Sequence, residues 1–312
     1  MTEAFICDAI RTPVGRYNGG LSAMRVDDLA AHPIKALMQR NANVDWGSVD
    51  DVIYGCVNQA GEDNRNVARM AGLLAGLPVE VSGSTITRLC GSGLDAVNLA
   101  ARAIRTGECD LIIAGGVESM SRVALAADGG AMMVDPVFAF DHYYVPQGIG
   151  ADMIATIHGF SREDVDGYAV QSQRRAALAW QEGRFARSIV PVLDQAGMVI
   201  LDHDEHMRPQ TDMDSLAKLR PAFVKLGESG YDAVAQARYS AVLAKQGKLD
   251  AARKHLQGIQ PADDSQRIQW IQAEANLLRE ANDHKSAYEL LGKALEGLER
   301  GTGVIRMLVL PR

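Results

Sequence analysis

The stretch Ser84-Thr85-Ile86-Thr87-Arg88-Leu89-Cys90-Gly91-Ser92-Gly93-Leu94-Asp95-Ala96-Val97 decides the fold of this chain. Its β-branched first part predicts a strand, and the pattern after Gly93 predicts a helix that ends at Gly107. The apolar residues that recur there at helical spacing are Leu94, Val97, Ala101 and Ile104. Cys90 is therefore expected on the turn from a strand into a helix that packs on the core.

Cys90 is the candidate nucleophile of the chain. The partial positive charge at a helix N-terminus favours a thiolate, and Gly91 and Gly93 allow a substrate to approach closely. The alternative is a buried structural cysteine, which is common for a lone cysteine. The surrounding motif favours the nucleophile.

The first 120 residues alternate short apolar runs with helical patterns, which is typical of a layered α/β domain. The predicted strands are Ala4–Ala9, Asp51–Val57, Thr85–Leu89 and Leu111–Ala114, and the predicted helices are Asp27–Arg40 and Asn64–Leu77.

Composition excludes several classes of function. A net charge of −7 disfavours nucleic acid as the main partner. The N-terminus lacks the pattern of a secretory leader, and no apolar run approaches the ~20 residues that span a bilayer. The four cysteines show neither zinc-ligand spacing nor a disulfide framework, so we expect a cytoplasmic protein.

Several motifs occur in a fixed order along the first 121 residues. They are Asp8–Gly15, Gln59–Arg69, Thr87–Gly93 and Gly115–Ser121. Together they resemble the thiolases, which are acyl-CoA C-acyltransferases, although this family usually has Asn where Thr87 stands here. The resemblance implies a layered αβα N-terminal domain over 1–120 and a loop domain over 121–235 that covers coenzyme A. It also implies Cys90 as the nucleophile, acyl-CoA as the substrate, no permanently bound cofactor, and a homo-oligomer formed through the N-terminal domain.

The coenzyme A site is implied by the same resemblance. The segment Arg208–Phe223 is similar to the thiolase segment that holds coenzyme A, so Arg208 would contact the nucleotide end and Ser215 would bond the ligand. Ala222 and Phe223 would line the pantetheine channel, since an apolar wall suits that thin arm. Gln147 begins a segment where the family carries a Met-Gly-x-Thr-Ala-Glu motif, and we count it among the candidates although it departs from that motif.

A metal site is the alternative at Asp202-His203-Asp204-Glu205-His206, which gathers carboxylates and imidazoles. We predict no metal there, because this run resembles an ordinary exposed segment of the thiolase loop domain.

Beyond about residue 235 the thiolase resemblance stops. The family's Asn-Glu-Ala-Phe-Ala, Gly-His-Pro and Cys-x-Gly-x-Gly motifs are absent from this sequence. In the family they supply a positioned water, the base with its oxyanion donor, and the proton-shuttling second cysteine. We therefore expect an impaired enzyme with negligible turnover.

Residues 236–300 instead carry an internal repeat of 35 residues. Its paired positions are Gly247 with Asn282, Ala252 with Ala287, and Leu256 with Leu291. This resembles tetratricopeptide repeats, whose helical hairpins bind proteins. A generic amphipathic tail is the alternative, and residues 301–312 remain unassigned.

Three functions are left open by the sequence. The chain is a thiolase acting through Cys90, a coenzyme A-binding protein that is acylated without turnover, or an adaptor or fusion product whose helical repeats contact a protein partner.

Overall fold

The computed structural model describes residues 3–63, 65–130, 138, 142, 144–220, 237, 240, 243–244, 246–260 and 264–297. The chain divides into two compact units. The first comprises Met1–Gly129 and Gln171–Gln210, and the second Gly130–Val170 and Thr211–Arg312. Among the described helices, none is both long and apolar enough to cross a membrane.

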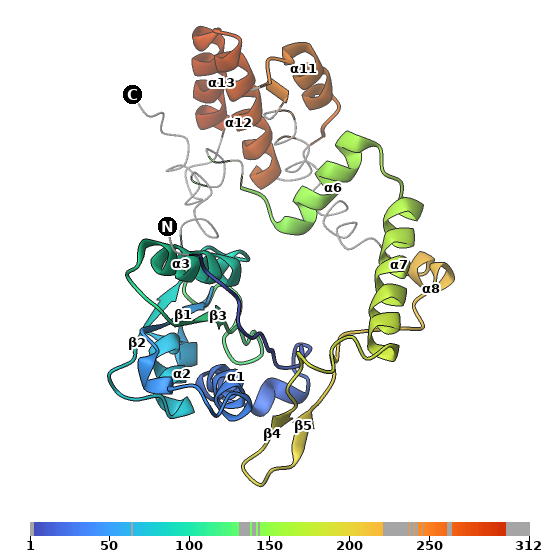
Figure 1. Ribbon diagram of the computed structural model, residues 1–312. Coiled ribbons are helices and arrows are strands. Elements are labelled where there is room, and N and C mark those ends of the chain that lie inside the picture. Colours follow the sequence, from blue (N-terminus) through green and yellow to red (C-terminus); the bar gives the residue numbers. More distant parts are fainter. Residues whose placement is uncertain are drawn as a thin grey trace. The chain divides into compact units, whose positions relative to one another are not determined.

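A parallel three-stranded sheet forms the centre of the first unit (Figure 1). Its strands are β1 (Asp51–Gly55), β2 (Ser82–Ile86) and β3 (Ile112–Gly116), in the order β2-β1-β3. Gly55 pairs with Ile86 on one side and with Gly116 on the other. The three strands therefore end at one common edge, where the loops that follow them meet.

Helices cover both faces of this sheet, as its alternating side chains require. Val52 and Tyr54 pack into the core beneath α1 (Val26–Arg40) and α2 (Val67–Ala75). Ile53 points to the opposite face and packs against α3 (Ser92–Thr106). The Tyr54 hydroxyl donates to the Ala30 carbonyl at 3.2 Å, and burial raises the Tyr54 pKa.

The buried face of α3 differs from the predicted one. Leu94 is 70% exposed, whereas Ala96 and Ala100 are buried against Ile53. The reason is the close approach of helix and sheet, since a Cβ atom on Gly55 would lie 2.5 Å from the backbone of Ser92. Ala96 and Ala100 fill that narrow space, with Leu99 packed partly against it, so the expectation of a core-packed Leu94 was wrong.

The predicted strand Ala4–Ala9 does not form. In the described part of this segment Phe5 and Ile6 are 72% and 79% exposed, and the segment pairs with no described strand. The first ladder-type contact comes at Arg11, whose N–H donates to the Ser188 carbonyl and whose carbonyl accepts from the Val190 N–H. An apolar run becomes a strand only where another strand offers its backbone groups.

Smaller elements complete the first unit. They are the 3₁₀ turns η1 (Gly20–Ala23), η2 (Trp46–Ser48) and η3 (Gly61–Asp63), and the hairpin strands β4 (Val192–Leu193) and β5 (Val199–Leu201). Val192 and Leu201 of the hairpin are buried with Leu21 and Leu29, which anchors the hairpin to the start of α1.

Residues 121–235 contain α6 (Gln147–His158), α7 (Arg162–Gln181) and α8 (Met213–Ala217). Reciprocal hydrogen bonds cap the start of α7. The Ser161 hydroxyl accepts from the Asp164 N–H at 3.1 Å, and the Asp164 carboxylate accepts from the Ser161 N–H at 2.8 Å.

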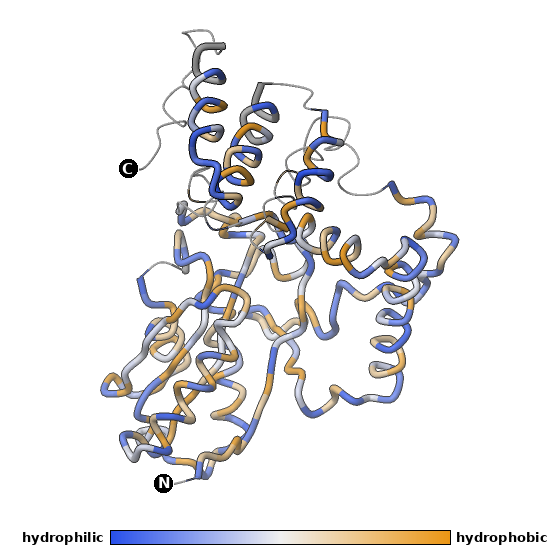
Figure 2. The backbone as a smooth tube through the Cα atoms, turned by 90° about the horizontal axis from the view of Figure 1, so that it is seen from above, coloured by the Kyte–Doolittle hydropathy of each residue, from blue (hydrophilic) through white to orange (hydrophobic). Residues whose placement is uncertain are grey.

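The internal repeat appears as repeated geometry in α11 (Leu249–Gln257), α12 (Asp264–Glu280) and α13 (His284–Gly297). Gly247 and Asn282 both have positive φ, at 75° and 60°, and the N–H groups of each residue and of the next one bond backward in the same pattern, to Ala244 and Leu243 and to Arg279 and Leu278. Ala252 and Ala287, one period apart, are both buried. Apolar residues recur between polar ones along the helices of the chain (Figure 2), and in α11, α12 and α13 the buried apolar side chains pack together in two clusters.

We expect Gly55→Ala to destabilise the first unit by roughly 1–3 kcal/mol, because the added methyl group would lie against the backbone of Ser92. Thermal unfolding measures this change. Gly72→Ala is the matched control, since its added Cβ meets Leu77 and Val52 at an ordinary 3.6 Å and improves the propensity of α2. Equal unfolding temperatures for Gly55→Ala and the wild type would contradict the close approach.

Candidate functional site

Cys90 lies exposed at the carboxyl edge of the parallel sheet, between the end of β2 and the start of α3. Gly91 is the N-cap residue of α3, so Cys90 comes directly before the helix N-terminus. This position combines access to solvent with the partial positive charge of the helix end.

The turn that carries Cys90 is strained and tightly bonded. Leu89 has φ of +48°, a conformation that disfavours a branched L-residue. The hydroxyl of the buried Ser92 donates to the Leu89 carbonyl at 2.6 Å and accepts from the Arg88 N–H at 2.8 Å. The Gly91 N–H donates to the Arg88 carbonyl at 3.1 Å.

The other three cysteines have different surroundings. Cys56 is buried, and Cys109 is half-buried. Burial, followed by the neighbouring carboxylates of Asp50 and Asp51, raises the pKa of the Cys109 thiol. Cys7 is exposed but lies in the extended segment that precedes Arg11. Cys90 is therefore the exposed cysteine that a sheet edge and a helix start hold in place.

Glu118, directly after β3, joins the loops that follow β1 and β3. Its carboxylate accepts from the Val57 N–H at 2.7 Å and from the backbone and side-chain amides of Asn58 at 3.1 Å. The Asn58 side-chain oxygen in turn accepts from the Ala126 N–H at 2.9 Å. Neither Asn58 nor Glu118 was expected in this role from the sequence. The available signal was a polar residue shortly after each of two strands whose ends meet.

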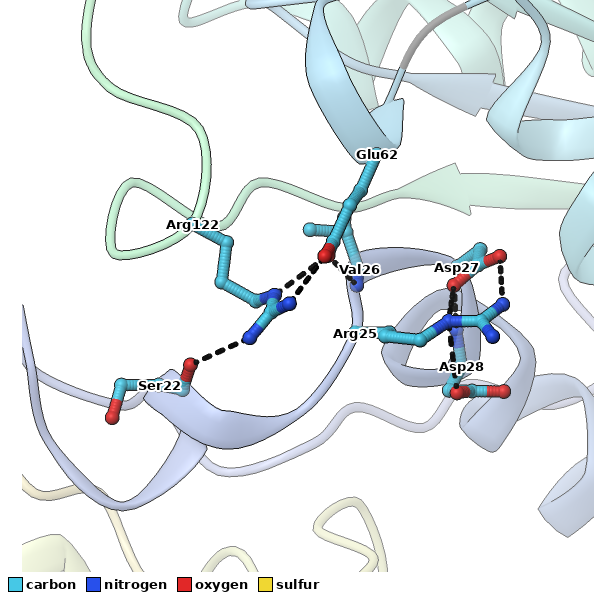
Figure 3. A network of polar contacts seen from close by, with 7 residues as sticks. All are labelled: Ser22, Arg25, Val26, Asp27, Asp28, Glu62 and Arg122. Carbon is cyan, nitrogen blue, oxygen red and sulfur yellow. Dashed lines mark hydrogen bonds and ion pairs between the residues drawn. The ribbon is translucent and has the colours of Figure 1, made fainter.

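A second carboxylate, Glu62, holds the same region from the side of α1 (Figure 3). The Arg122 guanidinium binds both Glu62 oxygens, and the Val26 N–H donates to Glu62 at 3.1 Å. Arg122 also donates to the Ser22 carbonyl at 3.3 Å. These bonds tie the loop after β3 to η3 and to the start of α1.

The acidic run that raised the question of a metal has another role in the structure. Arg11 binds both oxygens of Asp204, at 2.7 and 2.8 Å, and the Val14 N–H donates to the same carboxylate. Glu205 accepts from the N–H groups of Arg16 and Gly20 at 3.1 Å. Within the described residues, no three His, Cys, Asp or Glu side chains are grouped to hold a metal ion.

The candidate coenzyme A residues lie in different parts of the chain. Arg208 lies in the first unit, and its backbone N–H donates to the side-chain oxygen of Gln173 at 2.7 Å. Ser215, in the second unit, completes a capping box with Asp212 at the start of α8. Gln147 begins α6. Ala222 and Phe223 lie outside the described residues.

We expect Glu62→Gln to lower stability at pH 7 by about 1 kcal/mol, a modest value because the pair is roughly a third exposed. The hydrogen bond to Arg122 lowers the Glu62 pKa from its ordinary 4.5. The carboxylate therefore stabilises the fold fully above about pH 4.5, and this contribution is lost as the pH falls through the lowered value.

Chemical unfolding at pH 7 and pH 3 checks this sign, since the gap between wild type and Glu62→Gln should shrink at pH 3. Glu182→Gln is the control, because it removes the same charge from the exposed ion pair with Arg184. A gap that stays constant with pH would contradict the assignment.

Comparison with known proteins gives one consistent result. The family model described as "Thiolase, N-terminal domain" matches residues 4–231. A beta-ketoadipyl-CoA thiolase of Pseudomonas aeruginosa is 51% identical over 237 residues, which are 70% of this chain and 59% of the relative. The 3-oxoadipyl-CoA/3-oxo-5,6-dehydrosuberyl-CoA thiolase of Escherichia coli is 52% identical over 242 residues, 72% of this chain and 60% of the relative.

A more distant relative, the 3-ketoacyl-CoA thiolase of Pseudoalteromonas translucida, is 42% identical over 227 residues, covering 72% of this chain and 58% of the relative. The chain thus spans about 60% of the length of the curated relatives that it matches. Helices α11, α12 and α13 follow the residues that the family model matches. With the parallel sheet and the Cys90 turn in place, the match over residues 4–231 shows that this chain belongs to the thiolase family.

Proposed function

We propose that this chain performs acyl transfer from acyl-CoA thioesters to Cys90. The thiolate of Cys90 attacks the thioester carbonyl, the carbon–sulfur bond to coenzyme A breaks, and the thiolate of coenzyme A leaves and takes up a proton. The observation that carries the proposal is an exposed cysteine on a strained turn directly before a helix N-terminus, in a chain of the thiolase family.

The substrate class follows from the relatives. Their names specify beta-ketoadipyl-CoA, 3-oxoadipyl-CoA and 3-ketoacyl-CoA. We propose a 3-oxoacyl-CoA thioester as the substrate. On this substrate the Cys90 thiolate would attack the 3-oxo carbonyl, the bond between C2 and C3 would break, and the enolate of acetyl-CoA would leave and take up a proton. Free coenzyme A would then take the acyl group from Cys90.

We propose that turnover is impaired and that Cys90 accepts an acyl group slowly. Residues 232–312 carry none of the family's later motifs, which would supply the base, the oxyanion donor and the second cysteine. An oxyanion donor is worth about 10²–10³ in rate and acid–base catalysis roughly another 10²–10⁴. An acylated Cys90 that turns over very slowly is therefore the state that we propose for the 312-residue chain.

The coenzyme A surface is proposed along the segment that begins at Arg208. A guanidinium suits a phosphate group because its donors form a planar fork. Ser215 and Gln147 are proposed as further polar contacts, and Ala222 with Phe223 as the apolar wall of the pantetheine channel.

A protein-binding function of the helical repeats is a second proposal, supported by one specific observation. The two helical segments repeat the same positive-φ turn at Gly247 and Asn282 and the same buried alanines, Ala252 and Ala287. That geometry suits a repeat of the tetratricopeptide type, whose faces receive a protein partner. We also propose a homo-oligomer formed through the thiolase domain and a cytoplasmic location.

We expect the purified chain to become acetylated at Cys90 when it is incubated with acetyl-CoA, and to thiolyse acetoacetyl-CoA at a negligible rate. Peptide mass spectrometry locates the acetyl group, and absorbance of the 3-oxoacyl-CoA measures turnover. Cys90→Ala should abolish acetylation, and Cys7→Ala should leave it unchanged. Robust Cys90-dependent turnover would overturn the proposed impairment, whereas acetylation elsewhere would overturn the nucleophile.

We expect weak coenzyme A binding that Arg208→Ala reduces about tenfold, roughly 1.4 kcal/mol, because one charge-assisted contact is lost. Calorimetry with free coenzyme A measures the affinity. Arg184→Ala is the control, since Arg184 is an exposed arginine paired with Glu182. An affinity that Arg208→Ala leaves unchanged would remove Arg208 from the site.

A further inference from the structure

We propose that Ser92 is the positioning residue that keeps the Cys90 turn in its reactive conformation. The inference rests on the proposed role of Cys90 as nucleophile and adds the residue that acts through it. Ser92 does not touch the substrate in this proposal. Its hydroxyl acts on the backbone of the two residues before Cys90.

The hydroxyl of Ser92 uses both of its bonding capacities on this turn. It donates to the Leu89 carbonyl at 2.6 Å and accepts from the Arg88 N–H at 2.8 Å. The Ser92 N–H also donates to the Leu89 carbonyl, at 3.0 Å. One side chain thus bridges the start and the middle of the turn that ends in Cys90.

These bonds serve the turn and not the cap of the helix. Ser92 is the first residue of α3, and the N-cap position belongs to Gly91, which has no side chain to bond the helix. A serine that capped the helix would instead bond N–H groups that follow it. The Ser92 hydroxyl faces backward in the chain, toward Arg88 and Leu89.

The turn needs such support because Leu89 is strained. A positive φ of 48° places its Cβ in a crowded conformation that L-residues disfavour. Leu89 is half-exposed, so packing alone does not hold it there. Two hydrogen bonds from a buried hydroxyl are of the size that offsets this strain.

Ser92 itself is held rigidly, which makes it a useful anchor. Ser92 is 4% exposed. Its backbone packs so closely on Gly55 that a Cβ atom added to Gly55 would lie only 2.5 Å from the Ser92 carbonyl carbon. Gly55 is the last residue of the central strand β1 and pairs with both neighbouring strands. The sheet therefore fixes Ser92, and Ser92 fixes the turn that presents Cys90.

Alkylation by iodoacetamide tests the proposal without requiring turnover. The Cys90 thiolate displaces iodide and forms a carbon–sulfur bond, and peptide mapping gives the rate constant at each cysteine between pH 6 and pH 9. We expect Ser92→Ala to slow alkylation of Cys90 about tenfold across this range and to leave Cys7 unchanged. Thr106→Val is the control, because it removes a hydroxyl that bonds the backbone at the opposite end of α3.

A double variant separates positioning from a general loss of stability. Glycine adopts positive φ without strain, so Leu89→Gly added to Ser92→Ala should restore most of the lost Cys90 rate. The proposal would be overturned if Cys90 in Ser92→Ala were alkylated at a rate within twofold of wild type. It would also be overturned if Ser92→Ala changed the alkylation rates of Cys7, Cys90 and Cys109 by the same factor. A double variant as slow as Ser92→Ala would also overturn it.

The wild-type chain provides a further measurement if Ser92→Ala does not fold. The Arg88 amide should exchange its hydrogen as slowly as amides inside β2, and loop-like exchange there would overturn the proposal. Failure of the nucleophile itself is distinguishable, because Cys90 would then react no faster than Cys7 in the wild-type chain.

Discussion

The contact between Gly55 and the start of α3 is the constraint on which the candidate site depends. With no side chain on Gly55, the end of β1 lies directly against the backbone of Ser92. That contact sets the depth of α3 on the sheet and selects its small residues, Ala96 and Ala100, for burial. It also fixes where the turn that carries Cys90 begins, so the position of Cys90 depends on a glycine 35 residues earlier in the chain.

Carboxylates provide the second level of order around the sheet edge. Glu118 binds the loop after β1, Glu62 binds the start of α1 and the loop after β3, and Asp204 and Glu205 bind the segment from Arg11 to Gly20. Loops carry unsatisfied N–H groups, and an ionised carboxylate can accept several of them at once. The acidic side chains of the first unit thus organise backbone, which is why an acidic run that resembled a metal site serves another purpose.

The helical segment follows a different logic, because its order comes from a repeated local pattern. Gly247 and Asn282 form turns with the same positive φ and the same backbone hydrogen bonds, and Ala252 and Ala287 are buried at equivalent places. Small residues at these places let the helices approach closely. The family match at residues 4–231 and this repeat therefore describe two parts of one chain that are built on different principles.

The sequence by itself determined the local features of this protein. The capping pair Ser161 and Asp164 and the repeated residues Gly247 and Asn282 act over a few residues, and the structure shows both. The strand expected at Thr85–Leu89 forms at Ser82–Ile86, so its presence was determined locally and its bounds were not. Ordered motifs around Cys90 also sufficed to indicate the thiolase family. Tertiary structure decided which face of α3 is buried, that Ala4–Ala9 forms no strand, and that Asn58, Glu118 and Ser92 surround the sheet edge. Those outcomes depend on which distant backbones meet, and hydrophobic periodicity carries no information about that meeting.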